Sequence, residues 1–563
     1  MREFKKAVNI SLWLLVFSIN GNFPLNAQNE IPHLRKQGTA TQLVVDGKPF
    51  LMLAGELRNS TCSNLEYMKG IWPRLARGNM NAVIATASWE LVEPEEGKFD
   101  FTLVDAIIKE SESANLKTIL IWFASWKNSG SIYIPSWVKK DYQRFPRTLD
   151  PTGKPLEILS TFGEESMKAD ARAFAMMMRH IRETDKNRNV ILVQVENEVG
   201  IRNAIRDFCP AAEKAFYGPV PREVINYLTE NKTAMSPELY QVWKANGFKT
   251  SGNWEDVFGK SFVDTDSWKA LSFYTEELFM AYHYARYIGY VAAEGKKEYN
   301  LPMYCNAWLK QPDYPWTGRF PGGGPLAEVM DMWKIAAPAI DFISPDVYYK
   351  DFQWVMEQYH RLDNPMFIPE TRGGATGASN LLFAIGEYNI MGFSPFGVDG
   401  YPGPENNPLA DTYSLLNEMS GLILQNQGVG TMLGILVNEE KPYQEFEMGD
   451  YVVMADPMKS RRPAGQQPDY DHGTPSSGGL IIQLGRDQFI VLGRDLNVRF
   501  KLKEPGELPY IGVDHVDEGV FKDGKWIPGR RLNGDETHCS TFSGTGLKMG
   551  GMSIQEITLY RYK

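Results

Sequence analysis

Short apolar runs alternate with longer stretches of helical periodicity over residues 40–427. We expect strands at residues 49–54, 81–87, 118–123, 190–195, 301–305, 342–345, 366–369 and 390–393. A short apolar run followed by a helical pattern is typical of βα units around a parallel sheet. Eight such units are the number that closes a (β/α)8 TIM barrel, so the pattern predicts an α/β barrel domain over residues 28–427.

Two regions depart from this repeat. Roughly a hundred residues, about 201–300, separate the fourth and fifth strands, and their helical patterns at 237–245 and 268–293 predict a helical insertion. Beyond an eighth helix at 416–425, the pattern alternates with the period of a strand, which predicts an all-β, sandwich-like C-terminal domain over residues 430–563. Its expected strands are 444–454, 479–484, 488–492, 498–502 and 554–560, with an exposed loop at 461–478.

The N-terminus has the layout of a secretory signal peptide over residues 1–27. Basic residues near position 5 precede an apolar stretch at 7–19, and Ala27 offers a small residue at the cleavage point. The apolar stretch is too short to span a bilayer, and no later run of about 20 apolar residues follows. We therefore expect an exported protein, periplasmic or extracellular, without a membrane span.

Composition narrows the possible partners. The net charge is −10, from 59 Lys and Arg against 69 Asp and Glu, so no basic field favours nucleic acid. The four Cys show no CxxC spacing, and the seven His form no HxH or HExxH pattern, so no metal centre is expected. A single disulfide bond and the oligomeric state are left open by the sequence.

Acidic residues follow two of the expected strands directly. Glu196, Asn197 and Glu198 come straight after the fourth strand, and Glu370 closes the seventh. Because the carboxyl ends of barrel strands build the active site, folding would bring these distant groups together. The alternative is a charged strand end exposed to solvent. A pair of carboxyls is what glycoside hydrolysis requires, since one protonates the leaving oxygen and the other attacks the anomeric carbon.

Three blocks resemble known glycosidases. The run QVENEVG at 194–200 resembles the acid/base motif of family 35 glycoside hydrolases, which are mostly β-galactosidases of a retaining clan of (β/α)8 barrels. The block at 89–101 resembles the segment after strand two of families 35 and 42, and 125–138 resembles the strand-three block. The C-terminal region is similar to the β-domain appended to a bacterial branch of family 35.

This resemblance implies a retaining exo-β-galactosidase that acts on oligo- or polysaccharides, and the expected signal peptide implies that it is secreted. No metal or organic cofactor is needed, because two carboxyls supply both the proton and the nucleophile. Glu198 would be the acid/base, Glu370 the nucleophile, and Asn197 a ligand of the hydroxyl beside the anomeric carbon. Tyr348, after the sixth strand, would bind the nucleophile, although a core tyrosine is an alternative. Retention requires the two carboxyls about 5–5.5 Å apart. The charge of Glu370 would favour a protonated Glu198 near neutral pH.

Departures from the family pattern leave more than one sugar as a candidate substrate. Glu90 and Lys127 stand where many members have an asparagine and an acid that contact sugar hydroxyls, and 187–189 replaces a Gly-Gly-Pro. A glucosaminide, arabinopyranoside or glucoside is therefore an alternative substrate. A non-catalytic glycan-binding protein is a third hypothesis, against which the intact carboxyl pair argues.

Further residues at strand ends are candidates for binding the carbohydrate. Tryptophan rings suit the C–H face of a pyranose, and core packing is the equal alternative for each. Arg58 is expected to hold the nucleophile carboxylate through paired hydrogen bonds. The tryptophan candidates are Trp126, Trp308 and Trp316, and the polar ones are Glu56, Arg58 and Asn306.

Overall fold

The computed structural model describes residues 30–261, 274–400, 407–438, 440–458, 477–540 and 544–563. The expected signal peptide, the start of the expected helix at 268–293 and nearly all of the expected loop at 461–478 lie outside these ranges. Within them, no helix combines the length and the apolar character needed to cross a bilayer. All four cysteines are free thiols.

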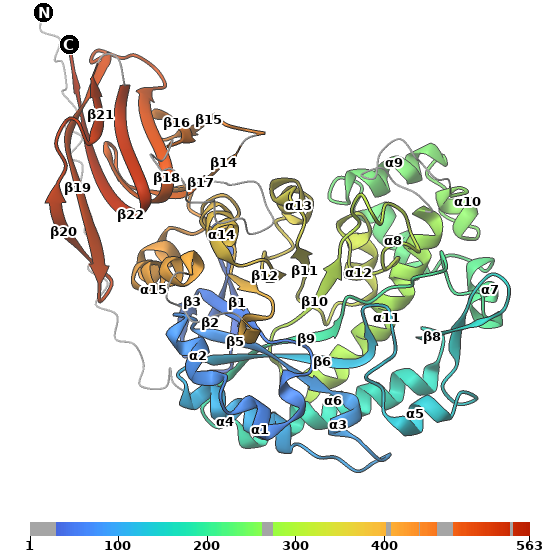
Figure 1. The fold of residues 1–563 in the computed structure, drawn as a ribbon. Coiled ribbons are helices and arrows are strands. Elements are labelled where there is room, and N and C mark those ends of the chain that lie inside the picture. Colours follow the sequence, from blue (N-terminus) through green and yellow to red (C-terminus); the bar gives the residue numbers. More distant parts are fainter. Residues whose placement is uncertain (1–29, 262–273, 401–406, 439, 459–476, 541–543) are drawn as a thin grey trace, which may run out of the picture.

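Eight parallel strands close into a barrel, so the predicted (β/α)8 architecture is confirmed (Figure 1). Each strand that the apolar runs predicted is present, with shifted ends. In chain order they are β4 (Met52–Glu56), β5 (Ala82–Ser88), β6 (Lys117–Lys127), β9 (Val190–Asn197), β10 (Met303–Trp308), β11 (Phe342–Val347), β12 (Ile368–Thr371) and β13 (Gly392–Pro395). Their aliphatic and aromatic side chains fill the barrel interior.

A small antiparallel sheet that the sequence patterns did not predict lies ahead of the barrel. It consists of β1 (His33–Gln37), β2 (Ala40–Val45) and β3 (Lys48–Phe50). The first expected strand, 49–54, began too early because residues 48–50 belong to this sheet. Leu43 and Val45 pack into the barrel interior, so the sheet closes the amino-terminal end of the barrel.

Helices surround the barrel and form the expected insertion. The helices up to β9 are α1 (Leu65–Met68), α2 (Trp72–Arg77), α3 (Trp89–Val92), α4 (Thr102–Ser113), α5 (Ser136–Lys140) and α6 (Glu164–Thr184), with a hairpin of β7 (Arg147–Leu149) and β8 (Pro155–Leu159). The insertion holds α7 (Pro210–Phe216), α8 (Arg222–Glu230), α9 (Pro237–Ala245), α10 (Trp254–Phe258) and the long α11 (Tyr274–Glu298). The remaining helices are α12 (Met330–Ala336), α13 (Phe352–Tyr359), α14 (Gly374–Tyr388) and α15 (Pro408–Asn426), whose second half is the predicted eighth helix.

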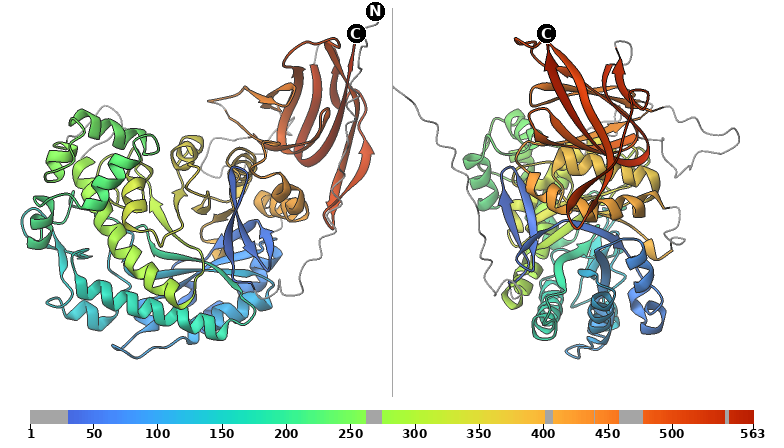
Figure 2. Two further views of the ribbon diagram at one scale, coloured as in Figure 1. Left: turned by 180° about the vertical axis from the view of Figure 1, so that it is seen from behind. Right: turned by 90° about the vertical axis from the view of Figure 1, so that its left-hand side faces the viewer.

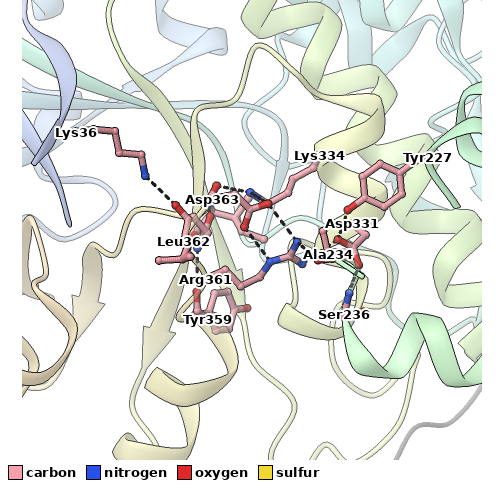
Figure 3. Close-up of polar contacts among 12 residues, drawn as sticks. Lys36, Tyr227, Ala234, Ser236, Asp331, Lys334, Tyr359, Arg361, Leu362 and Asp363 are labelled. Atoms are coloured by element: carbon pink, nitrogen blue, oxygen red, sulfur yellow. Dashed lines mark hydrogen bonds and ion pairs between the residues drawn. The ribbon is translucent and has the colours of Figure 1, made fainter. Parts of the chain in front are cut away.

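A buried carboxylate attaches the insertion to the barrel (Figure 3). Asp331 on α12 is 1% exposed and accepts hydrogen bonds from the Tyr227 hydroxyl at 2.7 Å and from the Ser236 backbone N–H at 2.7 Å. Arg361 donates to the same carboxylate at 2.8 Å. Because every oxygen is paired, the buried charge is compensated, and it fixes α8 and α9 against α12.

The C-terminal domain is one antiparallel sheet of nine strands, which confirms the all-β prediction (Figure 2). The strands are β14 (Met432–Val437), β15 (Gln444–Met448), β16 (Tyr451–Pro457), β17 (Ser477–Gly485), β18 (Gln488–Leu502), β19 (Tyr510–Lys522), β20 (Lys525–Arg531), β21 (Thr537–Ser540) and β22 (Gly544–Tyr562). The expected strand at 444–454 is a hairpin, because Gly449 turns the chain with a positive φ of 55°. The sheet encloses its own apolar core.

Helix α14 joins the two domains by packing directly on β14. Gly386 of the helix faces Gly434 of the strand, and a Cβ on Gly386 would lie 2.5 Å from the Gly434 nitrogen. A Cβ on Gly434 would lie 2.1 Å from the Phe383 carbonyl oxygen. The two backbones are therefore in contact, and neither position has room for a side chain.

Gly386→Ala should lower the stability of this joint by about 1–3 kcal/mol, because the new methyl group must push the β14 backbone away. Calorimetric melting of the full chain measures the loss. Gly421→Ala on α15 is the matched control, since a Cβ there meets nothing within 4 Å and alanine favours a helix by about 1 kcal/mol. Equal melting temperatures for the two variants would contradict the close contact.

Candidate active site

A cavity of about 240 Å³ opens at the carboxyl ends of the barrel strands. Its polar groups come from residues that end or follow β6, β9, β10, β11 and β12, as expected for a TIM barrel. The lining residues are Asn128, Glu198, Trp308, Leu309, Gln311, Asp346, Tyr348, Tyr349 and Glu370.

Three carboxyls meet in this cavity. One oxygen from each of Glu198, Asp346 and Glu370 lies within 4.8 Å of the others. Glu198 and Glu370 are each 6% exposed, so the structure brings together the two acids that the sequence singled out. An oxygen–oxygen separation of no more than 4.8 Å is compatible with the roughly 5–5.5 Å spacing of retaining glycosidases and is shorter than the roughly 6.5–9.5 Å of inverting ones.

Asp346 is a site residue that the sequence reasoning did not select. It is the last residue but one of β11 and is 4% exposed. The signal was available, because Asp346 is an acid at the carboxyl end of an expected strand, as Glu198 and Glu370 are.

The backbone at the end of β9 turns Glu196 and Glu198 in different directions. Both residues have a positive φ, 62° for Glu196 and 46° for Glu198. The Glu196 carboxylate accepts hydrogen bonds from the backbone N–H groups of Ser125 at 3.0 Å and Trp126 at 2.8 Å. Glu196 is thus committed to holding the end of β6, and Glu198 is the glutamate that faces the cavity.

Asn306 at the end of β10 connects three of these groups. Its side-chain oxygen accepts a hydrogen bond from the Glu198 backbone N–H at 2.9 Å, and its amide donates to Asp346 at 2.7 Å. The amide also donates to the Asn197 side-chain oxygen at 3.2 Å, which Gln194 contacts at 3.0 Å. Asn197 and Asn306 are therefore fixed in orientation before any ligand binds.

Glu370 is held from one side. The Tyr348 hydroxyl donates a hydrogen bond of 2.6 Å to one carboxylate oxygen, and the other oxygen has no hydrogen-bond partner within the described residues. The expected contact between Tyr348 and the acid is present. The second oxygen of Glu370 is buried and remains available to a bound ligand.

Burial and mutual repulsion raise the pKa values of these carboxyls. Burial is the largest cause for Glu198, followed by the charge of Glu370, and together they raise the pKa of Glu198 to about 7. The pKa of Asp346 is raised for the same two reasons. Burial also raises the pKa of Glu370, while the positive charge of Lys127 and the Tyr348 hydrogen bond act in the opposite direction.

Glu56, at the end of β4, adds a further acid to the cluster. It is 1% exposed, and neither carboxylate oxygen has a hydrogen-bond partner among the described residues. Burial, and then the charge of Glu370, raise its pKa well above the ordinary value. Lys127, which is 6% exposed at the end of β6, lowers the pKa values of Glu56, Glu198 and Glu370 alike, so it is the cation of the cluster.

Several sequence predictions are corrected by the structure. Trp126 offers no ring to a ligand, because it is fully buried and packs edge-on against Tyr284 and Tyr287. Arg58 does not hold Glu370, because its guanidinium pairs with Asp399 at 3.2 Å.

Three other candidates occupy different positions around the rim. Glu90 pairs with Lys139 at 3.2 Å and lines a separate hollow, so it lies outside the cavity of Glu198. Trp308 lines the cavity beside Arg202, whose guanidinium carbon lies 4.8 Å from the centre of its ring. Trp316 is half-buried in the loop after β10 and is not among the lining residues.

The three clustered carboxyls also have a spacing that a divalent cation accepts. A cation would require all three to be deprotonated, whereas burial and repulsion favour protons on Glu198 and Asp346. The arrangement fits proton transfer and nucleophilic attack better than metal binding.

Two parts of the chain match known protein families. Residues 74–368, just over half of the 563, match the β-galactosidase profile of glycoside hydrolase family 42. The chain belongs to this family. The sequence motif at 194–200 resembles family 35, whereas the block at 89–101 resembles both family 35 and family 42. The match therefore confirms the predicted resemblance to β-galactosidase-like glycoside hydrolases. Residues 409–543 match a domain of unknown function, DUF5597.

Individual relatives of this family 42 chain are distant. It is 29% identical over 176 residues to a β-galactosidase of Xanthomonas manihotis, covering 30% of this chain and 27% of the relative. It is 27% identical over 203 residues to human β-galactosidase-1-like protein 3, covering 34% and 29%. The alignments thus span less than a third of either relative. A β-galactosidase structure from Bacillus circulans sp. alkalophilus superposes with a TM-score of 0.45 at 14% identity, over 66% of this chain and 57% of that one.

Glu56→Gln should stabilise the protein at alkaline pH. Since the folded state holds the Glu56 proton well above the ordinary pKa of 4.5, stability falls as pH rises from 4.5 through the folded pKa. Glutamine removes this cost. Melting temperatures should therefore show a gain at pH 8 that shrinks towards pH 4.5.

The control for this prediction is Glu230→Gln, which removes a charge from an exposed position at the end of α8. That variant should show no comparable dependence on pH. A loss of stability in Glu56→Gln at both pH values would mean that the carboxylate is compensated in the folded state.

Proposed function

We propose that the protein is a retaining exo-glycosidase that releases terminal β-galactosyl residues from oligo- or polysaccharides. The observation that carries the proposal is the meeting of Glu198 and Glu370 across one small cavity. Two carboxyls at this spacing supply both the proton and the nucleophile that a double displacement requires. The cavity of about 240 Å³ is smaller than the roughly 300 Å³ at which drug-sized sites begin, which favours one terminal sugar.

In the first step, the Glu370 carboxylate attacks the anomeric carbon while Glu198 gives its proton to the departing glycosidic oxygen. The bond from the sugar to that oxygen breaks as the bond to Glu370 forms. In the second step, Glu198 takes a proton from water, whose oxygen displaces Glu370 and restores the original anomeric configuration. Tyr348 orients Glu370, and Asn306 orients the backbone that carries Glu198.

The remaining polar groups suit recognition of the sugar hydroxyls. Asn197 and Asn306 have fixed orientations, Glu56 has unpaired oxygens, and Trp308 offers its ring at the cavity wall. Lys127 among the acids supports the alternative that another β-glycoside is the substrate. We also propose that residues 1–27 direct export of the protein. The resemblance of the 194–200 motif to family 35 is part of the same proposal.

Glu198→Gln and Glu370→Gln should each lower turnover of an aryl β-galactoside by at least about a hundredfold, the usual contribution of such a group. Product analysis by NMR with the active parent should show retained configuration. Glu90→Gln is the matched control, because its carboxyl pairs with Lys139 outside the cavity. Near-parental activity in Glu370→Gln would overturn the proposal, and a panel of aryl glycosides identifies the sugar.

The pH dependence of kcat/KM should fall above about pH 7, because Glu198 must carry its proton and its pKa is about 7. Lys127→Met should move the fall in kcat/KM to higher pH, since the lysine lowers the pKa of Glu198. Lys139→Met provides the comparison, as Lys139 pairs with Glu90. If kcat/KM falls at the same pH in the parent and in Lys127→Met, the assignment of Glu198 as the proton donor is contradicted.

A further inference from the structure

A second cavity, of about 410 Å³, adjoins the catalytic one. Tyr348 and Tyr349 line both cavities, so the two cavities share a wall at these residues. One wall of the second cavity comes from the end of β11, the segment after it and α13, and another from the end of β12 and the start of α14. The third wall comes from the C-terminal domain, through residues at and after the end of β14.

Specific contacts hold the third wall in place. Gln353 on α13 donates to the Leu436 carbonyl oxygen at 3.2 Å and accepts from Lys441 at 2.9 Å. Glu440 pairs with Lys350 at 3.2 Å. Because β14 also lies in backbone contact with α14, the wall has a fixed position relative to the barrel.

The chemistry of this cavity suits a neutral carbohydrate. Trp354 supplies a half-buried aromatic ring, and basic and acidic groups lie around it in equal number, three of each. A balanced set of donors and acceptors recognises hydroxyl groups without preferring an anion or a cation. Arg372 lies in this cavity and donates to the Tyr348 carbonyl oxygen at 3.1 Å, which ties the second cavity to the tyrosine that holds Glu370.

We propose that the second cavity binds the neutral sugar that follows the cleaved sugar in an oligosaccharide, and that the C-terminal domain supplies part of this subsite through Glu440 and Lys441. The inference rests on the proposed glycosidase function. It gives a role in substrate selection to a domain whose family description assigns none.

The test compares two substrates that share the cleaved sugar. β-Galactosyl fluoride carries no second sugar and reports on the catalytic cavity, whereas β-linked galactotriose extends beyond it. Trp354→Ala and the double variant Glu440→Ala/Lys441→Ala should each lower the ratio of kcat/KM for galactotriose to kcat/KM for the fluoride by about tenfold, the effect of losing one stacking or hydrogen-bonding contact. Lys525→Ala, at an exposed position on β20, should leave the ratio unchanged.

An unchanged ratio in both variants, or an equal loss with both substrates, would overturn the inference. A parent enzyme that cleaves neither substrate would overturn the proposed function instead. In that case, calorimetric titration of Glu370→Gln with galactotriose still tests the second cavity. Binding weakened about tenfold by adding Trp354→Ala supports the subsite, and an unchanged Kd or the absence of binding rejects it.

Discussion

The crowding of buried carboxyls around a single lysine is the constraint on which the catalytic end of the barrel depends. Glu56, Glu198, Asp346 and Glu370 lie within range of one another's charge, and Lys127 is the cation that lowers the pKa values of all four. Burial makes each negative charge costly, so the cluster retains protons at a pH where an exposed carboxyl would be ionised. The pKa of about 7 of Glu198 follows from this crowding.

Such a cluster requires rigid support from outside the cavity. The Glu196 carboxylate accepts hydrogen bonds from two backbone N–H groups at the end of β6. The Ser125 hydroxyl in turn donates a hydrogen bond to Asp170 on α6. Burial and the neighbouring Asp170 charge raise the pKa of Glu196, so this pair also retains a proton. The supporting carboxyls therefore fix the end of β6 beside β9 where the pairing register of the two strands shifts, between Trp122 and Lys127.

The C-terminal domain is fixed to the same end of the barrel. The glycine contact between α14 and β14 sets the distance between the domains, and the Lys350 to Glu440 pair and the Gln353 hydrogen bonds add polar links between them. Since α14 follows directly after Glu370, the joint and the nucleophile candidate share one structural support. The C-terminal domain therefore lines a cavity that shares Tyr348 and Tyr349 with the cavity of the carboxyls.

The sequence alone determined the barrel, its eight strands, the helical insertion, the all-β C-terminal domain and the two glutamates, because hydrophobic periodicity and acids at strand ends are local signals. It missed Asp346 and the sheet of β1 to β3, and it misplaced Trp126, Arg58 and Glu90. The partners of those side chains, Tyr284, Asp399 and Lys139, lie elsewhere along the chain. Only the tertiary structure decides such pairings, because burial, hydrogen bonding and charge depend on neighbours that folding brings together from distant parts of the chain.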